Sequence, residues 1–138
     1  MSEPTPEQVE QLVAGAQAAR ENAYAPYSRF PVGAAVLAGG RVFIGVNVEN
    51  ASYPLGVCAE RNAVAAAVAA GERQIDAVAV VAGDQDVAPP CGGCRQVLNE
   101  FGPEMLVISA SLAGVRRTWH LSELIPNAFG PHSLPPPR

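Results

Sequence analysis

Two short stretches of the chain carry residues whose types and spacing could do chemistry. In the first, Cys58 lies two residues before Glu60, and Arg61 follows the glutamate directly. In the second, Cys91 and Cys94 enclose a pair of glycines. The sequence has no other cysteine, and an odd number of cysteines does not suit a disulfide framework. Thiols kept for a metal ion or for catalysis are therefore predicted, in preference to small buried hydrophobic residues.

Both stretches follow an irregular loop and open a predicted helix, where free N–H groups and the helix dipole lower the pKa of a thiol. Cys91 and Cys94 are three residues apart and so face the same way on the first turn, and Cys58 is the candidate third ligand. A redox pair, or half of a structural four-cysteine site, would be alternatives. A structural zinc site closes with four protein ligands, however, and His120 and His132 lie outside both stretches. Three ligands with one open position predict a catalytic zinc site.

Glu60 and Arg61 then take roles around the metal. Zinc lowers the pKa of water in an open position to about 7 in favourable sites. Glu60 lies too close to Cys58 in sequence to be a comfortable ligand of the same ion, so we predict that it carries protons. The alternative is a carboxylate that favours a helix N-terminus, worth about 0.3–1 kcal/mol. Zinc with three thiolates is a negative centre. Arg61 is predicted to hydrogen-bond a thiolate and offset that charge. The alternative is an arginine on a solvated helix face.

Strands and helices alternate along the chain in a way that would position both stretches. Thr5 and Gln8 have the spacing of a capping box at the start of the first helix. Helices are predicted from residue 5, over 58–71, from Pro90 to Gly102 and over 121–125; strands are predicted over 32–38, 41–48, 76–82, 105–110 and 114–120. This order predicts an α/β fold, a three-layer α-β-α sandwich around a mixed five-stranded sheet with an antiparallel opening hairpin.

Composition limits the possible partners and compartments. With 138 residues, 49% hydrophobic and 16% charged, the chain is expected to form one domain over 1–138, with a mobile tail over 131–138. The net charge is −4 and all nine basic residues are arginines without a basic run, so nucleic acid is not an expected partner. The start MSEPTPEQVE is not a signal peptide, and no apolar run approaches the roughly 20 residues that span a bilayer. A cytoplasmic protein without a membrane partner is expected.

The order of the two stretches carries a family resemblance. A ligand-x-Glu motif followed by Pro-Cys-x-x-Cys is the signature of zinc nucleobase deaminases. Over residues 23–129 the chain resembles the small homotetrameric, zinc-dependent cytidine deaminases of nucleoside salvage. The four blocks that carry the resemblance appear in that family's order: AYAPYSRFPVGAAV, GVNVEN, CAER and PCGGCRQV.

The resemblance implies hydrolysis of cytidine and 2′-deoxycytidine to uridine and 2′-deoxyuridine, with release of ammonia and one zinc ion per subunit. Cys58, Cys91 and Cys94 would hold the zinc. Glu60 would protonate N3 of the base, help deliver hydroxide to C4, and pass a proton to the departing ammonia. The relative preference for the two nucleosides does not follow from the sequence.

It also implies the substrate contacts. Phe30 would pack on the pyrimidine ring, Asn47 and Glu49 would hydrogen-bond the ribose 3′-hydroxyl, and the backbone around Ala59 and Cys91 would read the polar edge of the base.

In this family neighbouring subunits complete each site, which implies a homotetramer in which Tyr53 and Phe129 act on another chain's substrate. Two positions depart from the family pattern. Val46 follows Gly45 where a small residue is common, and Asn127 stands where many members have glycine.

Three rival functions are open. A deaminase of another heterocycle, such as blasticidin S, would share the zinc chemistry but not need the ribose contacts of Asn47 and Glu49. A polynucleotide deaminase would need a basic, aromatic-lined channel, which the net charge of −4 disfavours. A zinc-stabilised binding module without catalysis would close its fourth position and have no use for Glu60.

Overall fold

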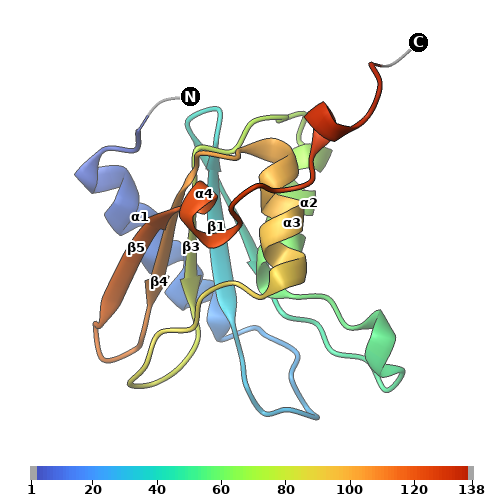
Figure 1. Cartoon of the computed structure of the whole chain (residues 1–138). Coiled ribbons are helices and arrows are strands. Elements are labelled where there is room, and N and C mark those ends of the chain that lie inside the picture. Colours follow the sequence, from blue (N-terminus) through green and yellow to red (C-terminus); the bar gives the residue numbers. More distant parts are fainter. Residues whose placement is uncertain (1–2, 137–138) are drawn as a thin grey trace.

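A mixed sheet forms the middle of the fold (Figure 1). The computed structural model describes residues 3–136. The strands within them span Gly33–Ala38 (β1), Arg41–Val46 (β2), Ala77–Val81 (β3), Leu106–Ala110 (β4) and Arg116–His120 (β5). They form a 5-stranded sheet in the order β2-β1-β3-β4-β5. Neighbours are antiparallel except β3 and β4, which are parallel, so the predicted mixed sheet and its antiparallel opening hairpin are confirmed.

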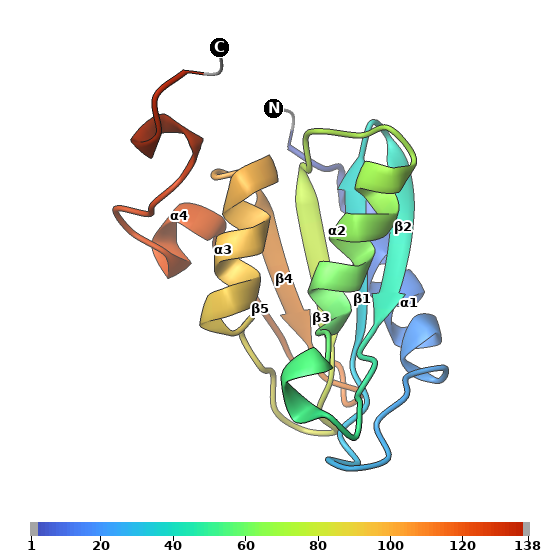
Figure 2. The same ribbon diagram turned by 90° about the vertical axis from the view of Figure 1, so that its right-hand side faces the viewer.

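Helices cover both faces of this sheet (Figures 1 and 2). They span Pro6–Arg20 (α1), Ala59–Ala69 (α2), Gly92–Phe101 (α3) and Leu121–Leu124 (α4), with short 3-10 turns at Tyr53–Leu55 and Pro131–Ser133. Helix α1 packs on one face, where Leu12 meets Ala35 and Leu37. Helices α2 and α3 pack on the other face against Ala34 and Val36. The alternation along β1 is the period of two expected of a strand covered on both sides, and the α-β-α sandwich is confirmed.

Local signals set several element boundaries as predicted. The Thr5 hydroxyl accepts the N–H of Gln8 at 3.1 Å, and the Gln8 side chain accepts the N–H of Thr5 at 2.9 Å, completing the capping box of α1. Gly39 and Gly40 have φ values of 59° and 74°, which suit a tight hairpin turn between β1 and β2. Several predicted ends differ from the observed ones by one or two residues. Helix α3, for example, begins at Gly92, because Cys91 has extended backbone angles and serves as its N-cap.

Gly45 lets the backbone of β2 approach α2 closely. A methyl group at this position would overlap the backbone of Ala63 and lie 2.5 Å from the carbonyl oxygen of Ala59. Since Ala59 opens α2 immediately after Cys58, the contact fixes the end of the helix that carries the first cysteine stretch.

We therefore expect Gly45→Ala to lower the free energy of unfolding by about 1–3 kcal/mol, as overpacking does, in a urea titration. Gly15→Ala is the control, because its methyl group would meet its nearest atom at 3.7 Å inside α1. In an unhindered helix position alanine is better than glycine, so Gly15→Ala should be neutral or stabilising. Equal stability of the two variants would contradict the close-approach argument.

The end of the chain follows α4 and continues along the side of α3 (Figure 2). Asn127 has a φ of 53°, a left-handed conformation that asparagine tolerates better than most residues. This explains how it can stand where many relatives of the resembled family have glycine. The mobile tail predicted over 131–138 stays a prediction: residues 131–133 form a 3-10 turn, and 137–138 lie outside the described residues.

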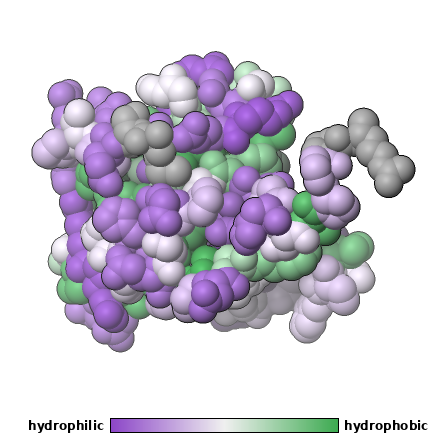
Figure 3. Space-filling view, turned by 45° about the horizontal axis from the view of Figure 1, so that its top comes forward, coloured by the Kyte–Doolittle hydropathy of each residue, from purple (hydrophilic) through white to green (hydrophobic). Residues whose placement is uncertain are grey.

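In the space-filling view of Figure 3, hydrophilic side chains cover most of the visible face, and hydrophobic ones show between them. Among the described residues, none of the helices has the length and apolar character needed to cross a bilayer.

Candidate active site

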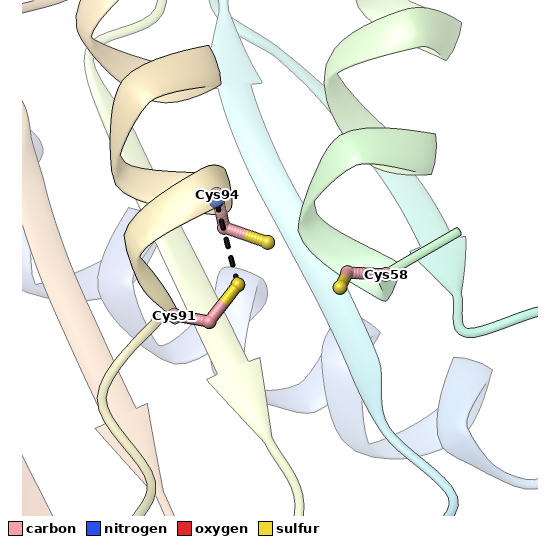
Figure 4. Close-up of side chains that lie close together, drawn as sticks. All are labelled: Cys58, Cys91 and Cys94. Carbon is pink, nitrogen blue, oxygen red and sulfur yellow. Dashed lines mark hydrogen bonds between the residues drawn. The ribbon is translucent and has the colours of Figure 1, made fainter. Parts of the chain in front are cut away.

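Three thiols meet where α2 and α3 begin. Cys58 is the N-cap of α2, Cys91 is the N-cap of α3, and Cys94 lies in the first turn of α3. Their sulfur atoms all lie within 4.8 Å of one another, pointing into the space between the two helix starts (Figure 4). The prediction that the two distant stretches meet in one group that could hold a metal is therefore confirmed.

The surroundings of the thiols fit a divalent cation. Cys94 is fully buried, and burial, followed by the nearby charge of Glu60, raises the pKa of its thiol. Burial also raises the pKa of Cys58, whereas the backbone N–H of Cys94 lowers the pKa of Cys91. Three thiols this close together, one of them fully buried, do not all ionise without a cation to balance them. Zinc, which binds thiolates tetrahedrally, suits this donor set.

The metal-binding group consists of these three thiols within residues 3–136. Glu60 is not part of it. His120 lies at the end of β5, 3.2 Å from the Glu3 carboxylate, and His132 lies in the 131–133 turn. With three protein ligands and no fourth in the described chain, the group has the pattern of a catalytic zinc site.

A cavity of about 190 Å³ opens beside the thiols. Five segments form its walls: the loop before β1, the residue after β2, the end of β3, the loop before α3 and the start of α2. The lining residues are Phe30, Val32, Asn47, Cys58, Ala59, Glu60, Val80, Ala82, Ala88, Pro89 and Cys91. Ligand pockets usually measure about 300–1,000 Å³. The cavity of a single chain is therefore suited to a ring such as a pyrimidine, with the rest of a larger ligand outside it.

Glu60 reaches this cavity from the first turn of α2. The residue is only 6% exposed, and burial raises the pKa of its carboxyl, while the positive charge of Arg61 acts in the opposite direction. A buried carboxyl that lines a cavity beside a metal site is well placed to exchange protons with a ligand.

Arg61 lies beside the thiols without the hydrogen bond that the sequence predicted. One guanidinium nitrogen donates to the Gly56 carbonyl at 3.4 Å, and its Nε is buried without a partner in the described part of the chain. Its charge opposes the effect of burial on the pKa of both Cys58 and Glu60. The role of Arg61 at the metal group stays a prediction, and its charge and its Nε, which has no partner among the described residues, are what could serve it.

We expect Arg61→Ala to weaken zinc binding about 10- to 100-fold, as loss of an outer partner of a metal site does, in a competition titration with a chromogenic chelator. Arg73→Ala is the matched control, since Arg73 follows α2 and its bonds within residues 3–136 go to the carbonyls of Val68 and Glu72. Unchanged zinc affinity and kcat in Arg61→Ala would mean that Arg61 has no role at the metal.

The predicted base contacts lie on the cavity wall. Phe30 and the buried Ala59 both line it. Ala59 is the first residue of α2, where backbone N–H groups lack partners within the helix. Asn47 also lines the cavity, but its amide is already engaged: Oδ1 accepts the N–H of Val32 at 2.9 Å, and Nδ2 donates to the carbonyl of Phe30 at 2.9 Å.

Other predicted contacts lie outside this cavity. Glu49 lines a second hollow of about 320 Å³, together with Tyr53 and Tyr27. Tyr53 is 74% exposed, and its ring centroid lies 5.8 Å from that of Tyr27. Phe129 is 61% exposed beside another hollow next to α3 and α4. Neither aromatic ring reaches the thiol cavity of its own chain.

Sequence reasoning missed two residues that support the site. Ser28 bonds to Glu49 and to the backbone of Phe30. Arg95 donates to the carbonyl of Pro90 at 2.7 Å, directly before Cys91, and to that of Leu124 at 2.8 Å. The serine two residues before Phe30 was a usable signal, because serine often caps its own turn. Nothing local to Arg95 indicated its partner in α4.

Comparisons with known proteins agree with this geometry. The family model for the cytidine and deoxycytidylate deaminase zinc-binding region matches residues 6–110. The cytidine deaminase of Sporosarcina psychrophila is 45% identical over 128 residues, which is 91% of this chain and 94% of the relative. That of Halalkalibacterium halodurans is 49% identical over 120 residues, or 86% of this chain and 91% of the relative.

A solved structure has a similar fold over most of the chain. The crystal structure of cytidine deaminase from Burkholderia pseudomallei superposes with a TM-score of 0.83 at 48% identity, covering 87% of this chain and 98% of that one. Since the matched region includes both cysteine stretches and most of the chain, this chain belongs to the cytidine and deoxycytidylate deaminase family.

Proposed function

We propose that the protein is a zinc-dependent cytidine deaminase, which hydrolyses cytidine and 2′-deoxycytidine to uridine and 2′-deoxyuridine and releases ammonia. The observation that carries the proposal is the meeting of three thiols and one buried carboxyl around a ring-sized cavity. Relatives named cytidine deaminase at 45% and 49% identity support the same substrate.

The reaction adds water to C4 of the base and expels the amino group, and it requires protons to be moved at three positions. Cys58, Cys91 and Cys94 would hold a zinc ion, which when bound would supply the Lewis acidity that makes water a nucleophile at neutral pH. The Glu60 carboxylate takes a proton from the attacking water and gives it to N3. It then moves a proton to the departing amine, so that one water is consumed and one ammonia leaves.

The charge around the thiols matters for this step. Zinc with three thiolates carries net negative charge, which weakens it as a Lewis acid. The N-termini of α2 and α3 and the Arg61 guanidinium bring positive charge to the same place and offset that excess.

Substrate contacts are proposed for the residues on and beside the cavity. Phe30 packs on the pyrimidine, and the backbone N–H groups near Ala59 and Cys91 bind the polar edge of the base. Asn47 and Glu49 bind the 3′-hydroxyl, using the acceptor and donor capacity that their contacts within the chain leave free.

We further propose a homotetramer in which Tyr53 and Phe129 complete the sites of neighbouring subunits. Both rings are exposed and neither lines the thiol cavity of its own chain, although aromatic side chains of this size are usually buried in part. A cytoplasmic location stays a prediction.

Mixing two impaired subunits tests the shared site. Glu60→Gln and Phe129→Ala chains, each weakly active alone, are expected to regain activity when assembled together, because some sites then combine an intact Glu60 with an intact Phe129 from another chain. Co-expression with two affinity tags and tandem purification isolates the mixed oligomers for assay. No gain over the separate variants would place Phe129 in its own chain's site or outside any site.

The proposed function is tested by following ammonia release and the ultraviolet change when zinc-loaded protein meets cytidine. Cytosine, blasticidin S and a cytosine-containing oligonucleotide serve as comparison substrates. Turnover of cytidine and 2′-deoxycytidine, with little of the others, is expected. A zinc-loaded protein that turns over only blasticidin S, only the oligonucleotide or nothing would replace the proposal with one of the three rival functions.

A further inference from the structure

Glu49 is held by three hydrogen bonds from one loop. Its Oε1 accepts the backbone N–H groups of Tyr27 at 2.9 Å and Ser28 at 3.1 Å, and its Oε2 accepts the hydroxyl of Ser28. The Ser28 hydroxyl, followed by its N–H, lowers the pKa of the Glu49 carboxyl. The carboxylate therefore anchors the loop that precedes β1. Its Oε1 accepts two hydrogen bonds and its Oε2 accepts one, so the remaining acceptor capacity lies on Oε2.

The hydroxyl of Ser28 has a second bond, to Phe30. It accepts the N–H of Phe30 at 3.0 Å, across Arg29, whose φ of 58° places it in the left-handed region. A serine hydroxyl has one hydrogen, and that hydrogen is committed to Glu49. The left-handed conformation of Arg29 is unfavourable for a residue other than glycine, and the hydrogen bond between the Ser28 hydroxyl and the Phe30 N–H compensates for that cost.

Phe30 is thus held at both of its backbone groups by side chains. The Ser28 hydroxyl accepts its N–H, and the Asn47 amide donates to its carbonyl at 2.9 Å. Its ring, which is 47% exposed, lines the cavity beside Cys58 and Glu60. Because few neighbours cover the ring, its place on the cavity wall depends on these backbone bonds.

We infer that Ser28 is a positioning residue that joins the two halves of the substrate site, fixing the Glu49 carboxylate and the Phe30 ring relative to each other. This inference rests on the proposed function, since Glu49 meets the sugar and Phe30 the base of the same nucleoside. The hydroxyl makes one rigid unit of the segment 27–30 and Glu49. Without the hydroxyl, Glu49 and Phe30 can still contact the nucleoside, but they are no longer held in place before it binds. The loss therefore weakens substrate binding more than it slows the chemical step.

Three variants test the role of Ser28. Ser28→Ala removes the hydroxyl, and Ser28→Thr keeps it. Ser122→Ala is the matched control, because the Ser122 hydroxyl likewise donates to an exposed carboxylate, that of Glu104 at 3.1 Å. Each purified, zinc-loaded variant is assayed for KM and kcat with cytidine, and the amide exchange rate of Phe30 is measured by NMR.

We expect Ser28→Ala to raise KM about tenfold, the loss typical of one hydrogen bond to a charged group, with kcat changed less than threefold. The Phe30 amide should exchange faster in this variant, zinc content should stay unchanged, and Ser28→Thr should recover most of the affinity. Ser122→Ala should match the wild type in all respects.

An unchanged KM in Ser28→Ala, or equal losses in the alanine and threonine variants, would overturn the inference. Unchanged exchange of the Phe30 amide would overturn it as well, even if the wild type did not deaminate cytidine. Failure of the proposed function is seen separately, as a zinc-loaded wild type without turnover.

Discussion

Glu60→Gln is expected to lower kcat for cytidine by about 10²- to 10⁴-fold, the usual contribution of a positioned acid–base group. Glutamine keeps the shape of the side chain but cannot take a proton from water or give one to N3 or the departing amine. Zinc content should not change, because Glu60 does not belong to the group of three thiols. The measurement is kcat by the ultraviolet change, with zinc determined on the same sample.

Glu7→Gln separates catalysis from helix stabilisation. Glu7 occupies the second position of α1, as Glu60 does in α2, so both carboxylates meet a helix N-terminus. If Glu60 only favoured the helix dipole, both variants would lose about 0.3–1 kcal/mol of stability and keep their turnover. A Glu60→Gln protein with wild-type kcat would therefore remove Glu60 from the mechanism.

The stability of Glu60→Gln should move in the opposite direction from its activity. Burial raises the pKa of the Glu60 carboxyl, so the folded protein disfavours its ionised form relative to the unfolded chain. Glutamine avoids this cost. We expect a Tm equal to or above that of the wild type, which is common where an active site tolerates strain for function. A lower Tm would indicate that Glu60 stabilises the fold.

Removal of zinc by a chelator is expected to abolish turnover and to lower Tm by about 10 °C. Zinc at 1,000 times its Kd adds about 4 kcal/mol to the folded state, and each kcal/mol moves the Tm of a domain of this size by roughly 3 °C. Without the cation, the buried Cys94 thiol holds its proton, since burial raises its pKa. Binding then releases protons, so zinc affinity should fall as the pH is lowered.

Cys94→Ser tests whether the three thiols are the origin of this effect. The variant should bind zinc weakly, have no measurable turnover, and show nearly the same Tm with and without chelator. Addition of zinc to the wild-type apoprotein should restore both activity and Tm. A wild type that keeps its activity and Tm in excess chelator would contradict the zinc site.

Much of this protein follows from its sequence alone. The capping box at Thr5, the turn at Gly39 and Gly40, and the hydrophobic periods depend on neighbouring residues, so elements and fold class were predictable. The thiol site was predictable for a related reason. A helix start supplies free N–H groups to a thiol, and residues three apart meet on one turn, so local spacing indicated the ligands.

Tertiary structure decided how the side chains around that site are used. The engagement of Glu49 and Asn47 with the loop before β1, and the bond from Arg95 to the carbonyl of Leu124 in α4, were not predicted. These contacts join segments that are distant in sequence, and their partners are set by strand register and loop paths. Caps and spacing indicated the three thiols and Glu60, because those signals act within a few residues, whereas the substrate contacts were implied by the family resemblance. Only the packing of β1, β2 and α2 decided which of their donors and acceptors remain free for a substrate.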